Sequence, residues 1–224
     1  MGGSNVIKIL YEDNHLLVVV KPVNMPVQED ESKDLDLLNA LKEDIKIRHQ
    51  KPGNVFLGLV HRLDRPVGGV MVFAKTSKAA SRLSEQVRNH EMQKEYLAVV
   101  MNKVTPAKGT MIDHLLKDES TNIVSINSLG KEAILSYELL AYEEDKSLVK
   151  IDLKTGRSHQ IRIQFASRSF PLYGDQKYNE EARTGQQIAL FAATLSFKHP
   201  VTKEFLTYSA KPVDAYPWNI FKYD

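Results

Sequence analysis

Residues 61–69 read His61-Arg62-Leu63-Asp64-Arg65-Pro66-Val67-Gly68-Gly69. Apolar segments flank this polar stretch, with Gly58-Leu59-Val60 before it and Val70-Met71-Val72-Phe73-Ala74 after it. Pro66 fixes one backbone angle, and the two glycines allow a turn that side chains would block. The pattern predicts a polar loop held between two buried segments, around which the rest of the chain is arranged.

Asp64 is the chemically suggestive residue of this loop. Positive charge from the neighbouring Arg62 and Arg65 would favour its ionised carboxylate. A charged acid fixed at the edge of a hydrophobic core is a candidate functional residue. The alternative is a structural aspartate that caps a turn and pairs with arginine, and the loop alone does not separate these two interpretations.

The charge of the chain is unevenly distributed. Its 224 residues are 42% hydrophobic and 26% charged, which is typical of a soluble globular protein, and the net charge is only +2. Residues 10–45 carry nine acids against three lysines, whereas residues 146–178 carry seven basic residues against two acids. A locally basic face of this kind can attract a polyanion even when the whole protein is nearly neutral.

Several classes of site and location are excluded or disfavoured. The chain has no cysteine, which rules out disulfides, thiol nucleophiles and zinc–thiolate sites. No apolar run approaches the roughly 20 residues of a membrane span, and the start lacks the features of a signal peptide. We therefore expect a cytoplasmic protein with no membrane partner, in which residues 1–5 form a flexible leader.

The hydrophobic pattern predicts more strands than helices. Apolar or alternating runs suggest strands over 6–11, 16–20, 70–74, 94–100, 124–126, 134–137, 148–153, 188–197 and 205–210. Helices are expected after Asp34, after Ser77 and after Ser158, each of which can cap a first turn. The sequence thus predicts an α+β fold, a single domain on a largely antiparallel mixed sheet flanked by helices.

Two further segments are candidates for chemistry. Lys94-Glu95-Tyr96 places charges before an aromatic residue at a strand start. The other segment, Thr155-Gly156-Arg157-Ser158-His159-Gln160-Ile161-Arg162, leads from a turn into a helix, and a helix N-terminus suits phosphate. Taken singly, these segments are better explained by a core or interface tyrosine and by a plain capped helix with surface arginines. The seven histidines show no metal-ligand spacing, and the chain contains no nucleotide-binding glycine motif.

The three segments, in this order, resemble the RluA family of RNA pseudouridine synthases. His61-Arg62-Leu63-Asp64 is similar to the family's signature loop, and Lys94-x-Tyr96 and the segment from Thr155 to Arg162 match two later motifs. Gly174-Asp175 and Tyr178 match the loop after them. The resemblance implies a pseudouridine-synthase-like catalytic domain over residues 6–224, without the N-terminal RNA-binding appendage of many relatives.

The resemblance also implies an activity, the isomerisation of specific uridines in structured ribosomal or transfer RNA to pseudouridine. Uracil is detached from its ribose and rejoined through carbon 5, with no cofactor and no metal. Asp64 would be the catalytic carboxylate, Tyr96 would pack against the target base, and Arg162 would pair with Asp64. Arg62 would fill the stack that the flipped-out base vacates. The other candidates for RNA contact are His61, Lys75, Arg157, His159, Arg168 and Lys177.

The sequence departs from the family pattern at a few positions. Val67-Gly68-Gly69 lacks the hydroxyl groups that usually follow the signature loop, Gln164 and Phe191 stand where histidines are common, and Ser169 replaces a glycine. Two other functions stay open. One is an RNA-binding module that has lost catalysis, and the other is a hydrolase of N-glycosidic bonds that uses Asp175 as its second carboxylate. In each case we expect a monomer.

Overall fold

The structure is a computed structural model that describes residues 7–222. The expected leader over residues 1–5 lies outside the described residues. Backbone contacts divide the chain into two compact units, Met1–Met92 with Thr194–Ala210 and Gln93–Ala193 with Lys211–Asp224. We call them unit 1 and unit 2. The prediction of one catalytic domain over residues 6–224 stays a prediction.

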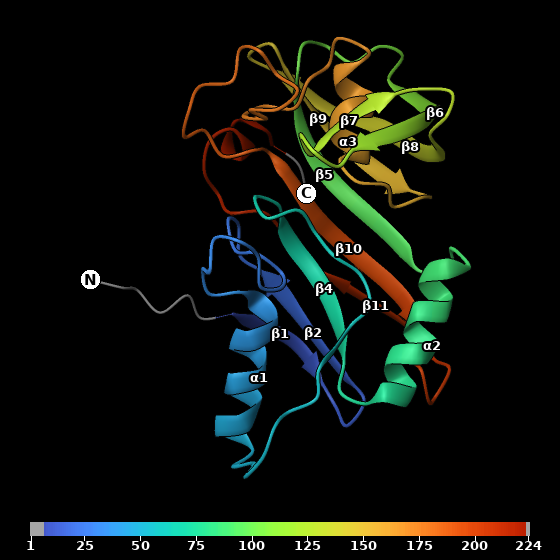
Figure 1. The fold of residues 1–224 in the computed structure, drawn as a ribbon. Coiled ribbons are helices and arrows are strands. Elements are labelled where there is room, and N and C mark those ends of the chain that lie inside the picture. The colour runs from blue at the N-terminus through green and yellow to red at the C-terminus, as the bar shows by residue number, and fades with distance from the viewer. Residues whose placement is uncertain (1–6, 223–224) are drawn as a thin grey trace. The chain divides into compact units, whose positions relative to one another are not determined.

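Unit 1 is a sheet with two helices. Its elements are β1 (Lys8–Glu12), β2 (Leu16–Lys21), α1 (Leu37–Arg48), β3 (Gly58–Leu59), β4 (Gly68–Ala74), α2 (Ser77–Arg88), the second half of β10 (Leu190–Lys198) and β11 (Phe205–Ser209). The pairs β1–β2, β2–β4, β3–β4 and β10–β11 are antiparallel. Figure 1 shows β1, β2 and β4 side by side. Every residue of β4 is buried, as the apolar run after the signature loop predicts.

Unit 2 is built on an antiparallel sheet in the order β5-β9-β8-β6-β7. Its elements are β5 (Gln93–Met101), β6 (Lys108–Asp118), β7 (Ile123–Ile126), β8 (Lys131–Glu143), β9 (Lys146–Leu153), α3 (Gln160–Ala166) and a short 3₁₀ helix (Trp218–Ile220). In Figure 1, α3 lies among β6, β7 and β8. Phe165 of α3 is fully buried and meets the ring of Tyr137 of β8 edge-on.

The α+β class and the largely antiparallel pairing are confirmed. Two of the expected helix caps were wrong by one or two residues. Asp36, not Asp34, caps α1 by accepting a hydrogen bond from the backbone N–H of Asn39 at 2.9 Å, and Thr76, not Ser77, caps α2. Asp34 forms an ion pair with Arg65 instead. None of the helices described within residues 7–222 is long and apolar enough to span a lipid bilayer.

Candidate active site

The Asp64 loop joins β3 to β4 in unit 1 and is fixed by its backbone. The N–H of Val67 donates to the carbonyl of Asp64 at 2.9 Å, which closes a turn directly after the acid. The ammonium of Lys21, at the end of β2, donates to the carbonyls of Arg65 at 2.9 Å and Val67 at 2.8 Å. It also donates to the carbonyl of Pro22 at 3.0 Å. The segment that carries Asp64 is therefore tied to the end of a buried strand.

Lys21 is a site residue to which the sequence reasoning gave no role. Its side chain is 1% exposed, and burial lowers the pKa of its ammonium to about 7, although the negative charge of Asp64 acts in the opposite direction. From the sequence, a lysine directly after an apolar run indicates only the end of a strand. Two of its three carbonyl partners, those of Arg65 and Val67, belong to a loop that only the fold brings to Lys21.

Arg65 and His61, which lie near Asp64 in the sequence, contact other parts of unit 1. Arg65 pairs with Asp34 and with Asp30, and its Nη1 donates to the hydroxyl of Ser32 at 2.9 Å. The Arg65 guanidinium therefore forms its ion pairs with the acidic loop before α1. His61 accepts a hydrogen bond at Nε2 from the backbone N–H of Val72 at 3.1 Å.

Arg62 is exposed, as a residue that enters an RNA stack would have to be. Asp64 itself is half-buried.

Tyr96 lies in unit 2, on β5 opposite Ile151 of β9, and is 8% exposed. Lys94 lies two residues before it and so faces the same side of the strand. A Cβ atom added at Gly156 would lie 3.7 Å from the Lys94 Nζ, so this ammonium sits at the turn that leads into α3. Burial lowers the pKa of Lys94. The strand and the turn thus bring the second and third sequence motifs together.

The third motif folds differently from the expectation at its helix start. The residue before α3 is His159, with a left-handed backbone (φ 51°), and not Ser158. No side chain caps the helix from His159. The turn is held instead by Gln160, whose Oε1 accepts from the hydroxyl of Thr155 at 2.8 Å and from the N–H of Arg157 at 3.0 Å. The His159 ring lies 2.8 Å from the Tyr178 hydroxyl through Nδ1.

Arg162 holds Asp175 with two hydrogen bonds. Its Nε donates to Oδ2 at 2.8 Å and its Nη2 to Oδ1 at 2.6 Å, with both side chains buried. The guanidinium also lies over the Tyr178 ring, 5.3 Å from its centre. Gly174 is required for this arrangement, because its φ is 72° and a Cβ there would lie 2.3 Å from the Gln187 carbonyl oxygen. Asp64 belongs to unit 1 and Arg162 to unit 2, and the expected pair between them stays a prediction.

The remaining candidates for RNA contact divide into two groups by their partners. Lys75 pairs with Glu12 at 2.8 Å and Arg168 pairs with Asp113 at 2.9 Å, so their charges are already compensated. Arg157 donates through Nε to the carbonyl of Glu132, and Lys177 donates to that of Asn122, both at 2.8 Å. A carbonyl does not neutralise a positive charge, and the contacts of Arg157 and Lys177 with RNA phosphates stay predictions.

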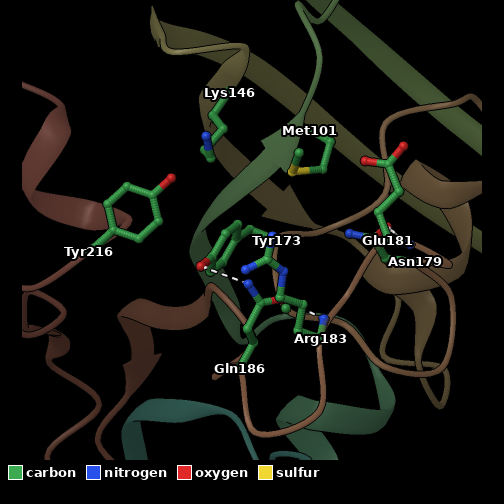
Figure 2. A pocket seen from close by; sticks show the side chains of 9 residues that line it. Met101, Lys146, Tyr173, Asn179, Glu181, Arg183, Gln186 and Tyr216 are labelled. Atoms are coloured by element: carbon green, nitrogen blue, oxygen red, sulfur yellow. Dashed lines mark hydrogen bonds between the residues drawn. The ribbon is translucent and has the colours of Figure 1, made fainter.

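A pocket of about 350 Å³ opens elsewhere in unit 2. Its lining consists of Met101, Lys146, Tyr173, Gly174, Asn179, Glu181, Arg183, Gln186 and Tyr216. Figure 2 shows the hydrogen bond from Gln186 Nε2 to the Tyr173 hydroxyl, 3.1 Å long. Met101 lies at the opposite end of β5 from Lys94, and none of the predicted site residues lines the pocket. Residues 7–222 contain no cluster of three or more His, Cys, Asp or Glu side chains placed to hold a metal ion.

Comparison with known families assigns the chain. The sequence model of the family described as RNA pseudouridylate synthase matches residues 15–167, a stretch that includes Asp64, Tyr96 and Arg162. The chain belongs to this family. Its membership confirms the predicted family and the predicted enzyme class.

Individual relatives in the RNA pseudouridylate synthase family agree. The chain is 33% identical over 225 residues to ribosomal large subunit pseudouridine synthase D of Vibrio cholerae, with 93% of this chain and 68% of that protein covered. It is 35% identical over 218 residues to ribosomal large subunit pseudouridine synthase C of Salmonella typhimurium, with 92% and 66% covered. The chain thus spans about two thirds of the length of these relatives. The solved structure of human RNA pseudouridylate synthase domain containing 4 has the same fold, with a TM-score of 0.77, 23% identity and coverage of 91% and 88%.

Proposed function

We propose that this chain isomerises uridine to pseudouridine in RNA, with Asp64 as the essential carboxylate. Family membership supports the reaction, because the matched residues include all three motifs of the candidate site. The observation that carries the role of Asp64 is the clamp on its loop. Lys21 and the turn at Val67 fix the backbone on the C-terminal side of the acid. A fixed backbone holds a reacting carboxylate in position before substrate arrives.

The remaining roles follow from the chemistry of the residues. Tyr96 is buried on a strand with little freedom to move, which suits a ring that packs against a flipped-out uracil. Arg162 is held rigidly by Asp175 and carries a permanent positive charge, which suits it to orient an acid. Either reaction of Asp64, attack on the nucleoside or removal of a sugar proton, proceeds in this proposal without a cofactor or a metal.

Ribosomal RNA is the first substrate to test. Several relatives are named as ribosomal large subunit pseudouridine synthases, and they are about one third identical to this chain. Transfer RNA is the second substrate. In either RNA the target base must leave its stack, at a cost of a few kcal/mol that is lower in loops than in helices.

The hydrolase alternative is disfavoured by the state of Asp175. A glycosidase-like mechanism needs a second carboxylate that reaches substrate. Both oxygens of Asp175 accept hydrogen bonds from Arg162, Oδ1 accepts a further one from the N–H of Lys177, and the side chain is 0% exposed. This carboxylate is engaged in hydrogen bonds within the protein and does not reach solvent.

The test is tritium release from RNA labelled at carbon 5 of uridine. Ribosomal and transfer RNA from a strain lacking the gene would be incubated with purified protein, with excess EDTA and no added cofactor. We expect the wild type to release tritium to water, and the Asp64→Asn variant to be slower by about 10²-fold or more, the lower range for loss of a general acid–base group. The modified uridine would remain in the RNA chain.

Three results would overturn the proposal. Free uracil in the supernatant would indicate the hydrolase. No release from either RNA would favour a binding module without catalysis. Release by Asp64→Asn at the wild-type rate would leave the isomerisation standing but remove Asp64 from it.

A further inference from the structure

Lys94 carries a partly buried positive charge that the protein does not compensate. Its ammonium has no hydrogen-bond or ion-pair partner among residues 7–222. Burial is the one cause of its lowered pKa, which means that no nearby carboxylate offsets the loss of water. A buried charge without a partner destabilises a fold, and such charges are normally paired. The resemblance that assigned a role to Tyr96 assigned none to Lys94.

A second donor without a partner adjoins the same turn. Gln160 is 3% exposed, and its Nε2 makes no hydrogen bond within the described residues. The orientation of this amide is fixed, because Oε1 must face the donor N–H of Arg157. The turn from Thr155 to Arg157 is therefore flanked by two groups that can donate hydrogen bonds and have no acceptor.

Access to Lys94 is controlled by a glycine. Gly156 is exposed, and the Lys94 Nζ is the one atom that a Cβ at this position would approach within 4 Å. A glycine leaves the backbone bare at this point, so a ligand atom can come close to the turn and to the ammonium beside it. Arg157, the next residue, adds a positive charge whose Nε is bound by the Glu132 carbonyl.

We propose that Lys94 and the turn at Gly156 form an anion subsite that binds a backbone phosphate of the RNA beside the nucleotide that Tyr96 contacts. The inference rests on the proposed function, since it takes RNA as the ligand. Lys94 and Tyr96 face the same side of β5 two residues apart, a separation of about 7 Å along a strand. Successive phosphates of a nucleic-acid strand lie a similar distance apart. One nucleotide can therefore place its base against Tyr96 and a neighbouring phosphate against Lys94.

The subsite explains why an uncompensated charge is retained. An ammonium that has already lost water gives a stronger interaction with an incoming phosphate than an exposed lysine does. In the absence of RNA, the desolvated Lys94 ammonium lowers the stability of the protein. Removing the charge should then stabilise the fold and weaken RNA binding, whereas removing a structural lysine would weaken both.

The experiment uses the full chain with Lys94→Met, which keeps the apolar stem and removes the ammonium. Lys94→Arg keeps the charge. Lys46→Met is the matched control, because it removes an exposed lysine from α1, directly after the acidic segment of residues 10–45. The probes are a single-stranded oligouridylate and the same oligomer with an uncharged methylphosphonate backbone. Binding is measured by fluorescence anisotropy over a series of salt concentrations, and the melting temperature is measured on the same samples.

We expect Lys94→Met to bind oligouridylate about tenfold more weakly and to reduce the slope of log K against log salt by about 0.7, the value for one phosphate contact to a single strand. Its affinity for the methylphosphonate oligomer should equal that of the wild type. Its melting temperature should stay the same or rise, by about 2–4 °C for a chain of this size. Lys94→Arg should keep most of the affinity, and Lys46→Met should match the wild type in affinity and in salt slope.

The proposal is overturned if Lys94→Met keeps the wild-type affinity and slope, or if it weakens binding of both oligomers equally. It is also overturned if the wild type does not bind oligouridylate, or if the variant melts at a lower temperature and Lys94→Arg does not restore affinity. None of these measurements requires turnover. A failure of the isomerase activity in the tritium assay is therefore distinguishable from a failure of the phosphate subsite.

Discussion

Arg162 and Asp175 form a two-point ion pair inside unit 2, with N–O distances of 2.8 Å and 2.6 Å. The Arg162 side chain is 7% exposed and that of Asp175 is 0% exposed. The pair joins α3 to the loop that follows it, and the Tyr178 ring covers the guanidinium. A bidentate pair fixes the plane of an arginine, so this geometry determines where the remaining guanidinium nitrogen points.

Breaking this pair from one side should be strongly destabilising. Asp175→Asn removes the two-point carboxylate partner of the buried Arg162 guanidinium, and the loss of one member of a buried ion pair typically costs about 3–5 kcal/mol. Urea unfolding of the wild type and the variant measures the difference. The double variant Arg162→Met/Asp175→Asn, which removes both charges, should recover part of the lost stability while remaining inactive. If the double variant is less stable than Asp175→Asn by the full effect of Arg162→Met alone, the two residues do not interact energetically.

Lys21 should give the protein a pH-dependent stability above neutrality. Burial lowers its pKa from 10.5 to about 7, so between these values the unfolded chain binds a proton that the folded chain releases. The free energy of unfolding should therefore rise with pH through this window, by up to about 1.4 kcal/mol per pH unit from this residue. Below about pH 7 both states are protonated and the contribution is constant.

Lys21→Met supplies the comparison. The difference in unfolding free energy between the wild type and Lys21→Met should move in favour of the wild type as pH rises from 7 to 9.5. The variant should also release tritium more slowly, because the carbonyls of Arg65 and Val67 lose their donor beside Asp64. A stability difference that is independent of pH would show that Lys21 keeps its ordinary pKa in the folded protein.

Ser169 stands where the family resemblance predicts a glycine, and the backbone at this position favours glycine. Its φ is 64°, in the left-handed region that glycine adopts without steric cost. Ser169→Gly should therefore stabilise the protein, by about 0.5–1 kcal/mol given the cost of a non-glycine residue in this region. Ser167→Gly is the matched control, because Ser167 has an ordinary helical backbone. This variant should be less stable than the wild type. Chemical denaturation of both variants tests the contrast.

Most strands of this fold could be predicted from local pattern, because a strand buried on both faces gives a continuous apolar run, although β6 was missed. The apolar run from Val70 to Ala74 is β4, and the run from Leu16 to Val20 is β2. The motifs located Asp64, Tyr96 and Arg162. β8 extends from Lys131 to Glu143, well beyond the predicted 134–137, and its residues 138–143 are half-buried or exposed, so they do not continue the alternation of the buried part.

The partners of the site residues could not be predicted in the same way. The expectation that the charge of Arg65 supports the ionised form of Asp64 relied on sequence adjacency, yet Arg65 pairs with Asp34. Lys21 lies more than 40 residues from two of the three carbonyls to which it donates. The predicted cap of α3 was wrong for a related reason. Gln160, inside the helix, makes the hydrogen bonds to the turn that Ser158 was expected to make. Such contacts depend on tertiary closeness, which short sequence windows do not contain.

Arg62 is exposed beside a fixed acid, and its expected role in base flipping separates two kinds of substrate. If its side chain fills the vacated stack, it offsets part of a cost of a few kcal/mol that arises when the base is stacked. Arg62→Ala should then lower kcat/KM on a folded substrate RNA by about tenfold or more, and lower it much less on a short single-stranded fragment with the same uridine. Arg88→Ala, which removes an exposed arginine from α2, should affect neither substrate. An equal loss on both RNAs would assign Arg62 to general RNA attraction, because that contribution does not depend on whether the target base must first be unstacked.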